Sequence, residues 1–276
     1  MNIALIPNYY NEKIIVACNE LVTELVQNRH KVYVHKDIWD KIQNTISVNS
    51  HSELENEADV FIAMGGDGTI IHTAKHAGDK PILGVNMGRL GYLAGFEYGE
   101  YEEILSAING YCEYDERMLI EIKSGENLIG YALNDGVVSA QLSKLLDFEV
   151  QIDKSTFNYR ADGLIVSTPT GSTAYSLSAG GPVIDSSISC MLFTPICPHS
   201  LFNRSIVLSP ITVLKLRVFP KYNEEVILTI DGGNPYFISP NEELSFTASN
   251  KKIKLIKGSQ NNFFELVNKK LIISKN

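Results

Sequence analysis

Residues 65–69 read Gly-Gly-Asp-Gly-Thr and directly follow the apolar run Asp-Val-Phe-Ile-Ala-Met at 59–64. A short β-prone run that ends in glycines predicts a strand that opens into a loop, and residues 70–77 can form a helix after it. Glycine lets the backbone approach a phosphate closely, and free N–H groups at a helix start attract anions. Within this glycine loop (residues 65–69), the Asp67 carboxylate can orient a hydroxyl group or accept its proton. The alternative interpretation is a tight turn in which Asp67 or Thr69 caps the helix.

Strand and helix patterns alternate through the first hundred residues on both sides of this loop. Strands are predicted at 3–6, 31–34, 60–64 and 81–86, and helices at 12–27, 70–77 and 101–108. Repeated strand–helix units imply a parallel sheet with helices on its faces. In such sheets ligands bind beyond the carboxyl ends of the strands, which is where the glycine loop falls.

Short strands separated by turn residues dominate the chain after about residue 110. They are predicted at 119–123, 127–133, 136–139, 148–152, 164–167, 213–218, 226–230 and 252–256, and a terminal helix is predicted at 263–271. We therefore predict an α/β plus all-β protein. An α/β domain with a parallel sheet spans 1–108, and the segment 258–276 returns to it. An antiparallel β-sandwich-like domain spans 109–257, with the active site in the cleft between the two.

Composition excludes several classes of function. The chain has 276 residues, a hydrophobic content of 44% and a formal net charge of −8, and it contains no basic block that would bind nucleic acid. No apolar run reaches the roughly 18 residues of a membrane span, and the N-terminus lacks a signal-peptide pattern. The four cysteines form no C-x-x-C pair and are expected to be reduced thiols. We expect a cytoplasmic protein that binds neither nucleic acid nor membrane.

A second informative stretch is the hydroxyl-rich turn at 168–175, Thr-Pro-Thr-Gly-Ser-Thr-Ala-Tyr, which follows the apolar run 164–166. Its proline and glycine fix a turn, and hydroxyl and backbone N–H groups converge where a helix can start. This arrangement suits a ligand rich in hydroxyls, amides and phosphates. Tyr175 adds an aromatic face, and Arg160 and Asp162 flank the entry strand. The alternative interpretation is a hydroxyl-rich turn without a ligand.

Together, the glycine loop and the hydroxyl-rich turn resemble those of the NAD kinase family, which phosphorylates the 2′-hydroxyl of the adenosine ribose of NAD to give NADP. The resemblance covers nearly the whole chain and includes the segments 84–93, 133–135, 180–183 and 194–201. The Gly-Gly-Asp-Gly sequence is shared with lipid kinases and, more distantly, phosphofructokinases. The Thr-Gly-Ser-Thr-Ala-Tyr segment is typical of a narrower group of proteins and indicates the NAD kinases themselves.

The resemblance implies a role for each matching residue. Asp67 matches the catalytic aspartate, which contacts the ribose hydroxyls and accepts a proton. The other matches are nucleotide-binding or substrate-binding residues: Gly65, Gly66, Gly68 and Thr69 in the glycine loop, His72, Tyr92 against adenine, Asn134 and Asp135 at the adenosine and ribose, Arg160 and Asp162 in the same pocket, and Thr173, Ala174, Tyr175, Ser176, Leu177 and Ser178 in the dinucleotide-binding turn. The family often has Glu at position 135, so Asp135 keeps the charge with a shorter reach.

The cofactor and partners follow from the same resemblance. Because the chain lacks a P-loop lysine, we expect Mg²⁺ or another divalent cation, carried by the donor, to neutralise the donor phosphates. The donor stays open between ATP, another nucleoside triphosphate and inorganic polyphosphate, and a homodimer or homotetramer is expected. We expect no metal site made by protein side chains. His30, His35, His51 and His76 are interpreted as scattered surface residues, and His199 as a structural histidine.

Other functions fit parts of the sequence. A lipid or sphingoid kinase would share the glycine loop, although the chain has no amphipathic or basic stretch that faces a membrane. A sensor that binds NAD or NADP without turnover would share both stretches, although an intact Asp67 argues against it. A Rossmann dehydrogenase fits least, because no Gly-x-Gly-x-x-Gly follows the first strand.

Overall fold

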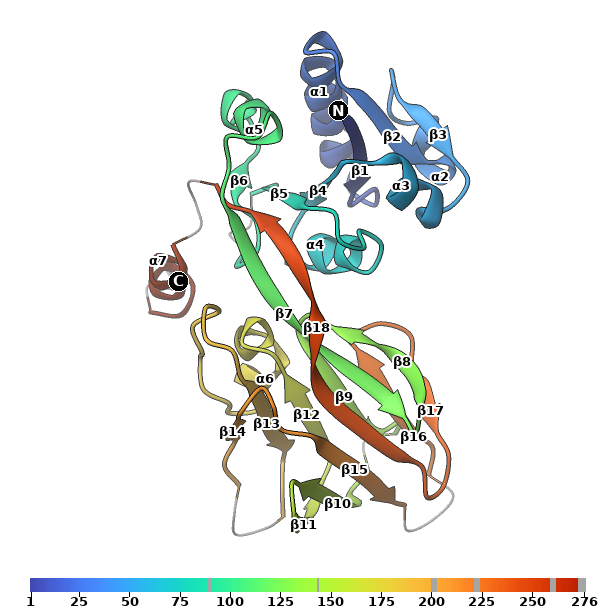
Figure 1. Ribbon diagram of the computed structural model, residues 1–276, viewed down its shortest axis with the longest axis vertical. Helices are drawn as coiled ribbons and strands as arrows, with labels where there is room; N and C mark the ends of the chain where they lie inside the picture. Colours follow the sequence, from blue (N-terminus) through green and yellow to red (C-terminus); the bar gives the residue numbers. More distant parts are fainter. Residues whose placement is uncertain (89–90, 143, 200–202, 221–223, 259–261, 273–276) are drawn as a thin grey trace. The chain divides into compact units, whose positions relative to one another are not determined.

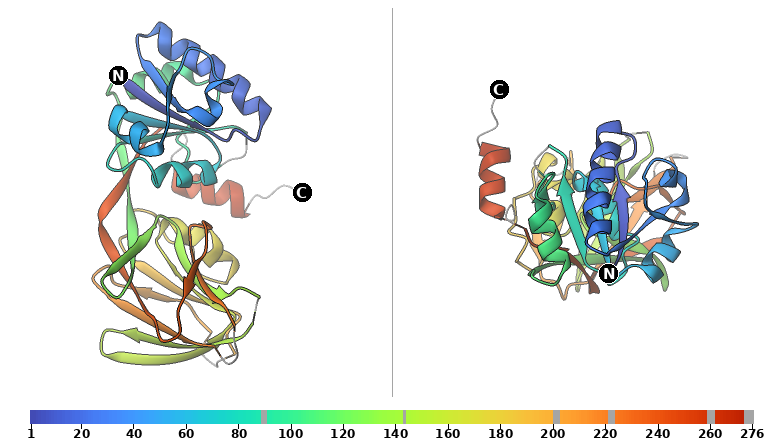
Figure 2. Two further views of the ribbon diagram at one scale, coloured as in Figure 1. Left: turned by 90° about the vertical axis from the view of Figure 1, so that its right-hand side faces the viewer. Right: turned by 90° about the horizontal axis from the view of Figure 1, so that it is seen from above.

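In a computed structural model, the chain is described at residues 1–88, 91–142, 144–199, 203–220, 224–258 and 262–272. Its contacts define two compact units: the first comprises residues 1–116 and the C-terminal residues from 253 onward, and the second comprises residues 117–252. Strands β7 (Tyr114–Ser124) and β18 (Glu243–Ile256) pair with each other, and each crosses a boundary between units (Figures 1 and 2). Residues 89, 90, 200 and 201 of the family-like segments lie outside the described residues.

The first unit is built on a parallel sheet with the strand order β5-β4-β1-β2-β3 (Figure 1). Its strands are β1 (Asn2–Pro7), β2 (Lys31–His35), β3 (Ile46–Val48), β4 (Val60–Gly65), β5 (Ile82–Asn86) and the short β6 (Phe96–Glu97). Its helices are α1 (Glu12–Gln27), α2 (Lys36–Trp39), α3 (His51–Glu57), α4 (Asp67–Ala74) and α5 (Tyr101–Ile108). The predicted parallel α/β fold is confirmed. The sequence analysis missed α2, β3, α3 and β6, which are too short to carry a clear periodicity.

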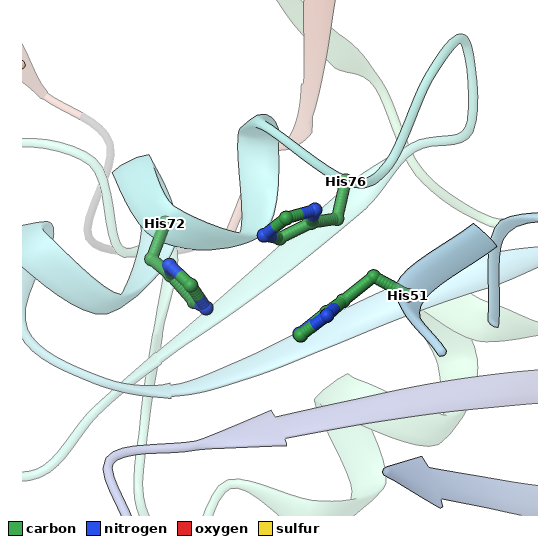
Figure 3. A group of neighbouring side chains, drawn as sticks. All are labelled: His51, His72 and His76. Atoms are coloured by element: carbon green, nitrogen blue, oxygen red, sulfur yellow. The ribbon is translucent and has the colours of Figure 1, made fainter. Parts of the chain in front are cut away.

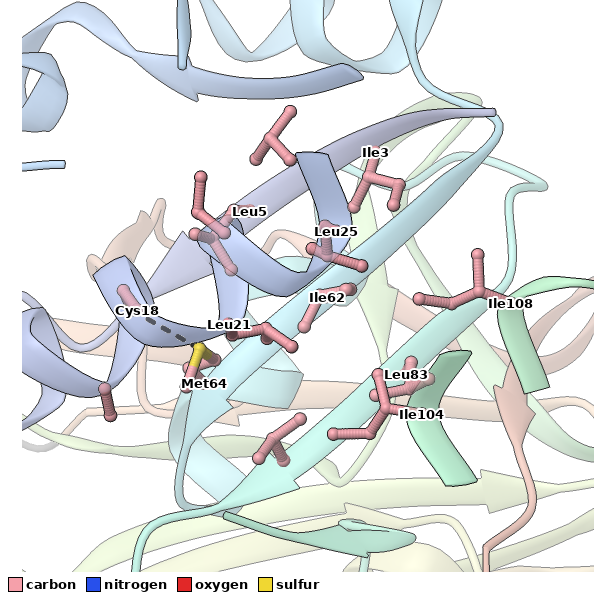
Figure 4. Close-up of a cluster of buried hydrophobic side chains, with 14 of the residues drawn as sticks. Ile3, Leu5, Cys18, Leu21, Leu25, Ile62, Met64, Leu83, Ile104 and Ile108 are labelled. Atoms are coloured by element: carbon pink, nitrogen blue, oxygen red, sulfur yellow. Dashed lines mark hydrogen bonds between the residues drawn. The ribbon is translucent and has the colours of Figure 1, made fainter. Parts of the chain in front are cut away.

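Helices α1 and α5 pack on one face of this sheet. Apolar residues recur along α1 at helical spacing, and alternate residues of β1, β4 and β5 meet them in one buried cluster (Figure 4). Each fully buried Leu or Ile side chain in it contributes about 1.5–3 kcal/mol. Helix α4 packs on the opposite face, where a Cβ at Gly84 would lie 2.5 Å from Cδ1 of Ile70. The absence of a side chain at Gly84 therefore lets α4 lie close to the sheet.

The second unit contains two antiparallel sheets. One runs β11-β10-β15-β18 and continues from β18 to β7 and β8, and the other runs β14-β13-β12-β9-β16-β17. The strands not yet defined are β8 (Asn127–Ala132), β9 (Asp135–Ala140), β10 (Leu146–Ile152), β11 (Ser155–Ala161), β12 (Gly163–Ser167), β13 (Met191–Ile196), β14 (Ile206–Leu208), β15 (Leu214–Phe219), β16 (Val226–Ile230) and β17 (Tyr236–Ile238). Side chains of both sheets, among them Phe148, Phe246 and Phe193, form a single buried cluster. The predicted sandwich-like arrangement is confirmed.

The C-terminal segment belongs to the first unit. Helix α7 (Phe263–Val267) is capped by Asn262, whose side chain accepts the Glu265 N–H at 3.3 Å, and a π-helical turn continues it over Asn268–Ile272. This agrees with the predicted terminal helix. None of the helices in the described part of the chain is long and apolar enough to span a bilayer.

Candidate functional site

The glycine loop joins β4 to α4 and places Asp67 as the first residue of the helix, three residues before the predicted start. Gly66 is the N-cap and no side chain caps the helix, so the interpretation of Asp67 or Thr69 as a cap is wrong. A Cβ at Gly65 would lie 2.2 Å from Oγ1 of Thr69, whereas Cβ atoms at Gly66 and Gly68 would meet no atom of the described residues within 4 Å. The loop therefore leaves open space at the start of α4, where unpaired backbone N–H groups favour an anion.

Backbone N–H groups hold both carboxylate oxygens of Asp67. The Tyr92 N–H donates to Oδ1 at 2.9 Å and to Oδ2 at 2.8 Å, and the Leu93 N–H donates to Oδ1 at 3.0 Å. A Cβ at Gly91 would lie 2.2 Å from Oδ1 of Asp67. This segment can therefore reach the carboxylate only because residue 91 has no side chain, and the contact fixes the direction of the carboxylate. The sequence analysis selected Tyr92 but not Gly91.

Lys270 brings a cation to the same carboxylate. Its Nζ lies 3.8 Å from Oδ2 of Asp67 and 3.9 Å from the ring centroid of Tyr92. Burial lowers the pKa of the Lys270 ammonium, although Asp67 acts in the opposite direction. Burial and the Asp67 charge both raise the pKa of the Tyr92 phenol, whose buried oxygen has no hydrogen-bond partner among the described residues. Sequence analysis missed Lys270, because a lysine in a terminal helix gives no signal of its target.

In the second unit, the hydroxyl-rich turn is bonded to the loop 133–135. The Thr168 N–H donates to the carbonyl oxygen of Asn134 at 2.8 Å, and the Thr168 hydroxyl donates to the carbonyl oxygen of Leu133 at 2.5 Å. A Cβ at Gly171 would lie 2.0 Å from the carbonyl oxygen of Asn134, so only glycine fits there. The structure thus brings Asn134 together with the hydroxyl-rich turn.

Asp231 organises the loop 133–135 from the other side. Its carboxylate accepts the N–H groups of Leu133 at 2.9 Å, Asn134 at 2.7 Å and Asp135 at 3.0 Å. Asp135 is 5% exposed, and burial, with a further contribution from the Asp231 charge, raises its pKa to about 7. A carboxyl group perturbed by both burial and a charged neighbour is typical of a functional site. The only sequence signal for Asp231, which sequence analysis missed, was the turn-like Asp-Gly-Gly at 231–233.

The predicted residues of the hydroxyl-rich turn and of α6 (Tyr175–Ser178) differ in exposure. Ser176 is fully buried, and its hydroxyl lies 2.9 Å from the Thr194 hydroxyl. The Thr173 hydroxyl donates to the carbonyl oxygen of Thr170 at 3.2 Å. These two side chains therefore stabilise the turn itself. Exposed side chains that can meet a ligand are those of Tyr175 and Ser178, with Ala174 and Leu177 half-buried.

For Arg160, Asp162 and His72, the contacts described below are with residues that the sequence analysis did not assign to the site. Nε of Arg160 lies 3.5 Å from Oδ1 of Asp147 across the β10–β11 hairpin. The Asp162 N–H donates to the carbonyl oxygen of Ile196 at 3.0 Å. The ring of His72 lies 4.9 Å from that of His76, between centroids.

The interpretation of the histidines as scattered surface residues is wrong. His51, His72 and His76 lie together, with centroid distances of 3.9 Å for His51–His76, 4.9 Å for His72–His76 and 5.8 Å for His51–His72. His30 is buried, at 7% exposure. The signal for part of this cluster was present in the sequence, because His72 and His76 are four residues apart.

Two family models match the chain. The ATP-NAD kinase N-terminal domain matches residues 3–114, and the ATP-NAD kinase C-terminal domain matches residues 134–258. Among curated relatives, the NAD kinase of Treponema denticola is 38% identical over 232 residues, covering 80% of this chain and 82% of the relative. The NAD kinase of Caldanaerobacter subterraneus subsp. tengcongensis is 35% identical over 278 residues, covering 98% of both chains.

Solved structures with the same fold include yeast NADH kinase complexed with NADH. It has a TM-score of 0.89 and 25% identity, and the match covers 100% of this chain and 89% of the yeast chain. The NAD kinase from Archaeoglobus fulgidus in complex with ATP has a TM-score of 0.78 and 24% identity, and covers 97% of this chain and 99% of its own. The second likeness shows the fold alone.

Proposed function

The chain belongs to the NAD kinase family, and on that premise we propose how its residues transfer a phosphoryl group to the 2′-hydroxyl of the adenosine ribose of NAD, giving NADP. The observation that carries the proposal is the Asp67 carboxylate at the first residue of α4, fixed by the N–H groups of Tyr92 and Leu93. It stands beside a loop whose glycines leave space for a phosphate. A base and an anion site are thus next to each other.

Asp67 orients the 2′-hydroxyl and accepts its proton as the oxygen attacks the terminal phosphorus of the donor. The bond from that phosphorus to the bridging oxygen breaks, and the donor leaves one phosphate shorter, as ADP when the donor is ATP. General base catalysis of this kind contributes a factor of about 10² to 10⁴. The N–H groups at the start of α4 and the Lys270 ammonium, which lies 3.8 Å from Asp67, supply positive charge for the donor phosphates. Positioning and charge neutralisation supply most of the rate in phosphoryl transfer, and these groups add to the charge that Mg²⁺ brings with the donor.

The adenosine part of NAD is assigned to the second unit. Asn134 and Asp135 bind the adenosine and its ribose, and the exposed Tyr175 and Ser178 contact the rest of the dinucleotide. Asp231 keeps Asn134 and Asp135 in place through the three N–H groups that it accepts. Because Asp135 has a pKa of about 7, it can act as a hydrogen-bond donor or acceptor to ribose near neutral pH.

The remaining assignments follow from the family and the composition. ATP is the first donor to test, because the matching family models are those of ATP-NAD kinases. Mg²⁺ enters with the donor phosphates as part of that substrate. The cytoplasm as compartment and a homodimer or homotetramer as assembly are proposals on the same basis. A lipid or sphingoid kinase is not favoured, since the family models and the curated relatives are NAD kinases.

NADP formation from NAD tests the assignment, with Mg²⁺ and a panel of ATP, other nucleoside triphosphates and polyphosphate. Asp67→Asn keeps the shape of the side chain but removes the base, so we expect turnover to fall by about 10² to 10⁴ while NAD binding stays within about tenfold. The matched control is Asp79→Asn, an exposed aspartate of the same unit, which should turn over like the wild type. Wild-type turnover in Asp67→Asn would remove Asp67 from the mechanism. Tight NAD binding without NADP formation from any donor would indicate a sensor.

A further inference from the structure

Three imidazole rings lie close together in the first unit (Figure 3). Of these three histidines, only His72 is among the binding residues that the family resemblance implies. His51 is the first residue of α3, His72 lies in the last turn of α4, and His76 follows two residues after that helix. Each ring offers a nitrogen, and these nitrogens all lie within 4.8 Å of one another. We call His51, His72 and His76 the histidine cluster.

Two backbone segments position the histidine cluster: the start of α3 carries His51, and the end of α4 with the residues that follow it carries His72 and His76. The Ser50 hydroxyl accepts the Glu53 N–H at 3.2 Å and caps the start of α3 at His51, and the Glu53 carboxylate accepts the N–H of the preceding Asn49 at 2.7 Å. His72 and His76 are four residues apart, one turn along the same face. The His76 N–H donates to the carbonyl oxygen of Thr73 at 2.9 Å, which extends the turn past the end of α4.

The charge state of the rings suits a cation. A metal binds the neutral imidazole, and protonated rings would repel it. Burial lowers the pKa of all three histidines, and it lowers that of His76 to about 4 with help from the neighbouring His51 and His72. All three shifts favour the neutral ring. His35, whose ring stacks on that of His51 at 5.0 Å between centroids, also lowers the pKa of His51, whereas Asp37 raises it. Lys75 lowers the pKa of His72 and of His76.

The donor set points to one class of metal. Imidazole nitrogens suit zinc, copper, nickel and cobalt, whereas magnesium and calcium prefer oxygen ligands. Three nitrogens at about 2.0–2.1 Å from a tetrahedral zinc ion stand about 3.3 Å apart, so the rings need to close by no more than about 1.5 Å. His51 and His76 stack at 3.9 Å between centroids with their planes 23° apart, so the rings must rotate about their side-chain bonds before both nitrogens face one ion.

We propose that the histidine cluster binds a divalent transition metal of the zinc class, with a fourth position left for water or an anion. The metal would join the start of α3 to the end of α4, the helix whose first residue is Asp67. This site is additional to the divalent cation that accompanies a phosphate donor. It goes beyond the proposed function, and its test measures binding instead of NADP formation.

The test uses the full chain without a polyhistidine tag, freed of metal with EDTA. Calorimetric titration with Zn²⁺ should show one tight equivalent, and His51→Asn and His76→Asn should each weaken it at least tenfold. The control is His199→Asn, which changes an exposed histidine of the second unit and should bind Zn²⁺ like the wild type. Co²⁺ titration provides a spectroscopic readout: we expect d–d absorption of a nitrogen-ligated ion without a thiolate charge-transfer band.

Two measurements keep the result decisive. Far-UV circular dichroism in EDTA shows whether each variant folds, and His72→Asn replaces any variant that does not, because His72 is exposed. Zn²⁺ should raise the melting temperature of the wild type and of His199→Asn but not of the cluster variants. The proposal is overturned if the wild type binds no Zn²⁺, if binding survives in the cluster variants, or if a thiolate band shows that a cysteine such as the exposed Cys197 holds the metal.

Discussion

Gly91→Ala places a methyl group against the proposed catalytic carboxylate. The new Cβ would lie 2.2 Å from Oδ1 and 3.0 Å from Cγ of Asp67, and a Cβ needs at least 3.0 Å from such an atom. The carboxylate oxygen must therefore retreat by about 1 Å, a displacement that can cost about a hundredfold in rate. The N–H bonds from Tyr92 and Leu93, now 2.8–3.0 Å long, would lengthen with it. The φ angle of Gly91 is not positive, so the effect is steric.

Steady-state kinetics should show kcat for NADP formation about a hundredfold lower, or about 2.7 kcal/mol in the barrier, with a smaller change in the KM for NAD. Overpacking should also lower the free energy of unfolding by about 1–3 kcal/mol. Asp67→Ala provides the control, because it removes the atoms that the new Cβ would meet. In that background Gly91→Ala should change stability by no more than about 0.5 kcal/mol. An unchanged kcat, or an equal loss of stability in both backgrounds, would refute the reasoning.

Two further predictions concern charges of the site. Lys270→Met should raise the KM for the donor about tenfold, because it removes one charge-assisted contact to phosphate. It should change the free energy of unfolding by less than about 1 kcal/mol. The control is Lys269→Met, at the adjacent exposed lysine, and an equal rise of KM in both variants would contradict the role of Lys270 at the donor phosphates. For Asp135, the pKa of about 7 in the folded chain exceeds the ordinary 3.8. Protonation therefore favours the folded state, and wild-type stability should fall by up to about 4 kcal/mol as pH rises from 4 to 7. Asp135→Asn should match the wild type near pH 4 and be more stable at pH 8 in urea unfolding, and a constant difference across this range would contradict the predicted pKa.

Regular elements could be predicted from the sequence where the hydrophobic pattern was long. The expected helices at 12–27 and 101–108 coincide with α1 and α5, since each carries an apolar face over at least two turns. The four-residue α2 and the three-residue β3 were missed, because so few residues cannot distinguish a period of 3.6 from a period of 2. Tertiary packing decides the conformation of such short segments, and a local sequence pattern carries no information about that packing.

The candidate site could be predicted where its residues are neighbours in the chain. The glycine loop and the hydroxyl-rich turn each carry several polar or glycine positions in a row. Gly91, Asp231 and Lys270 contact residues far from them in sequence. The residues next to them in the chain give no indication of these contacts. Only the folded chain brings the ammonium of Lys270 to 3.8 Å from Asp67. The pair His72 and His76 was visible as a four-residue spacing, but His51 joins it only through the start of α3.

The two units stabilise irregular loops by the same device, a carboxylate that accepts several backbone N–H groups. Asp67 accepts those of Tyr92 and Leu93, and Asp231 accepts those of residues 133–135. Hydrogen bonds to a charged acceptor contribute about 1.5–3 kcal/mol each, enough to fix short segments such as residues 91–93 and the residues that lead into β9. In the first unit this carboxylate is itself the proposed base, whereas in the second it only positions Asn134 and Asp135. Substitution of Asp231 should therefore act mainly on NAD affinity and substitution of Asp67 mainly on kcat, a division that the kinetics of the two variants can separate.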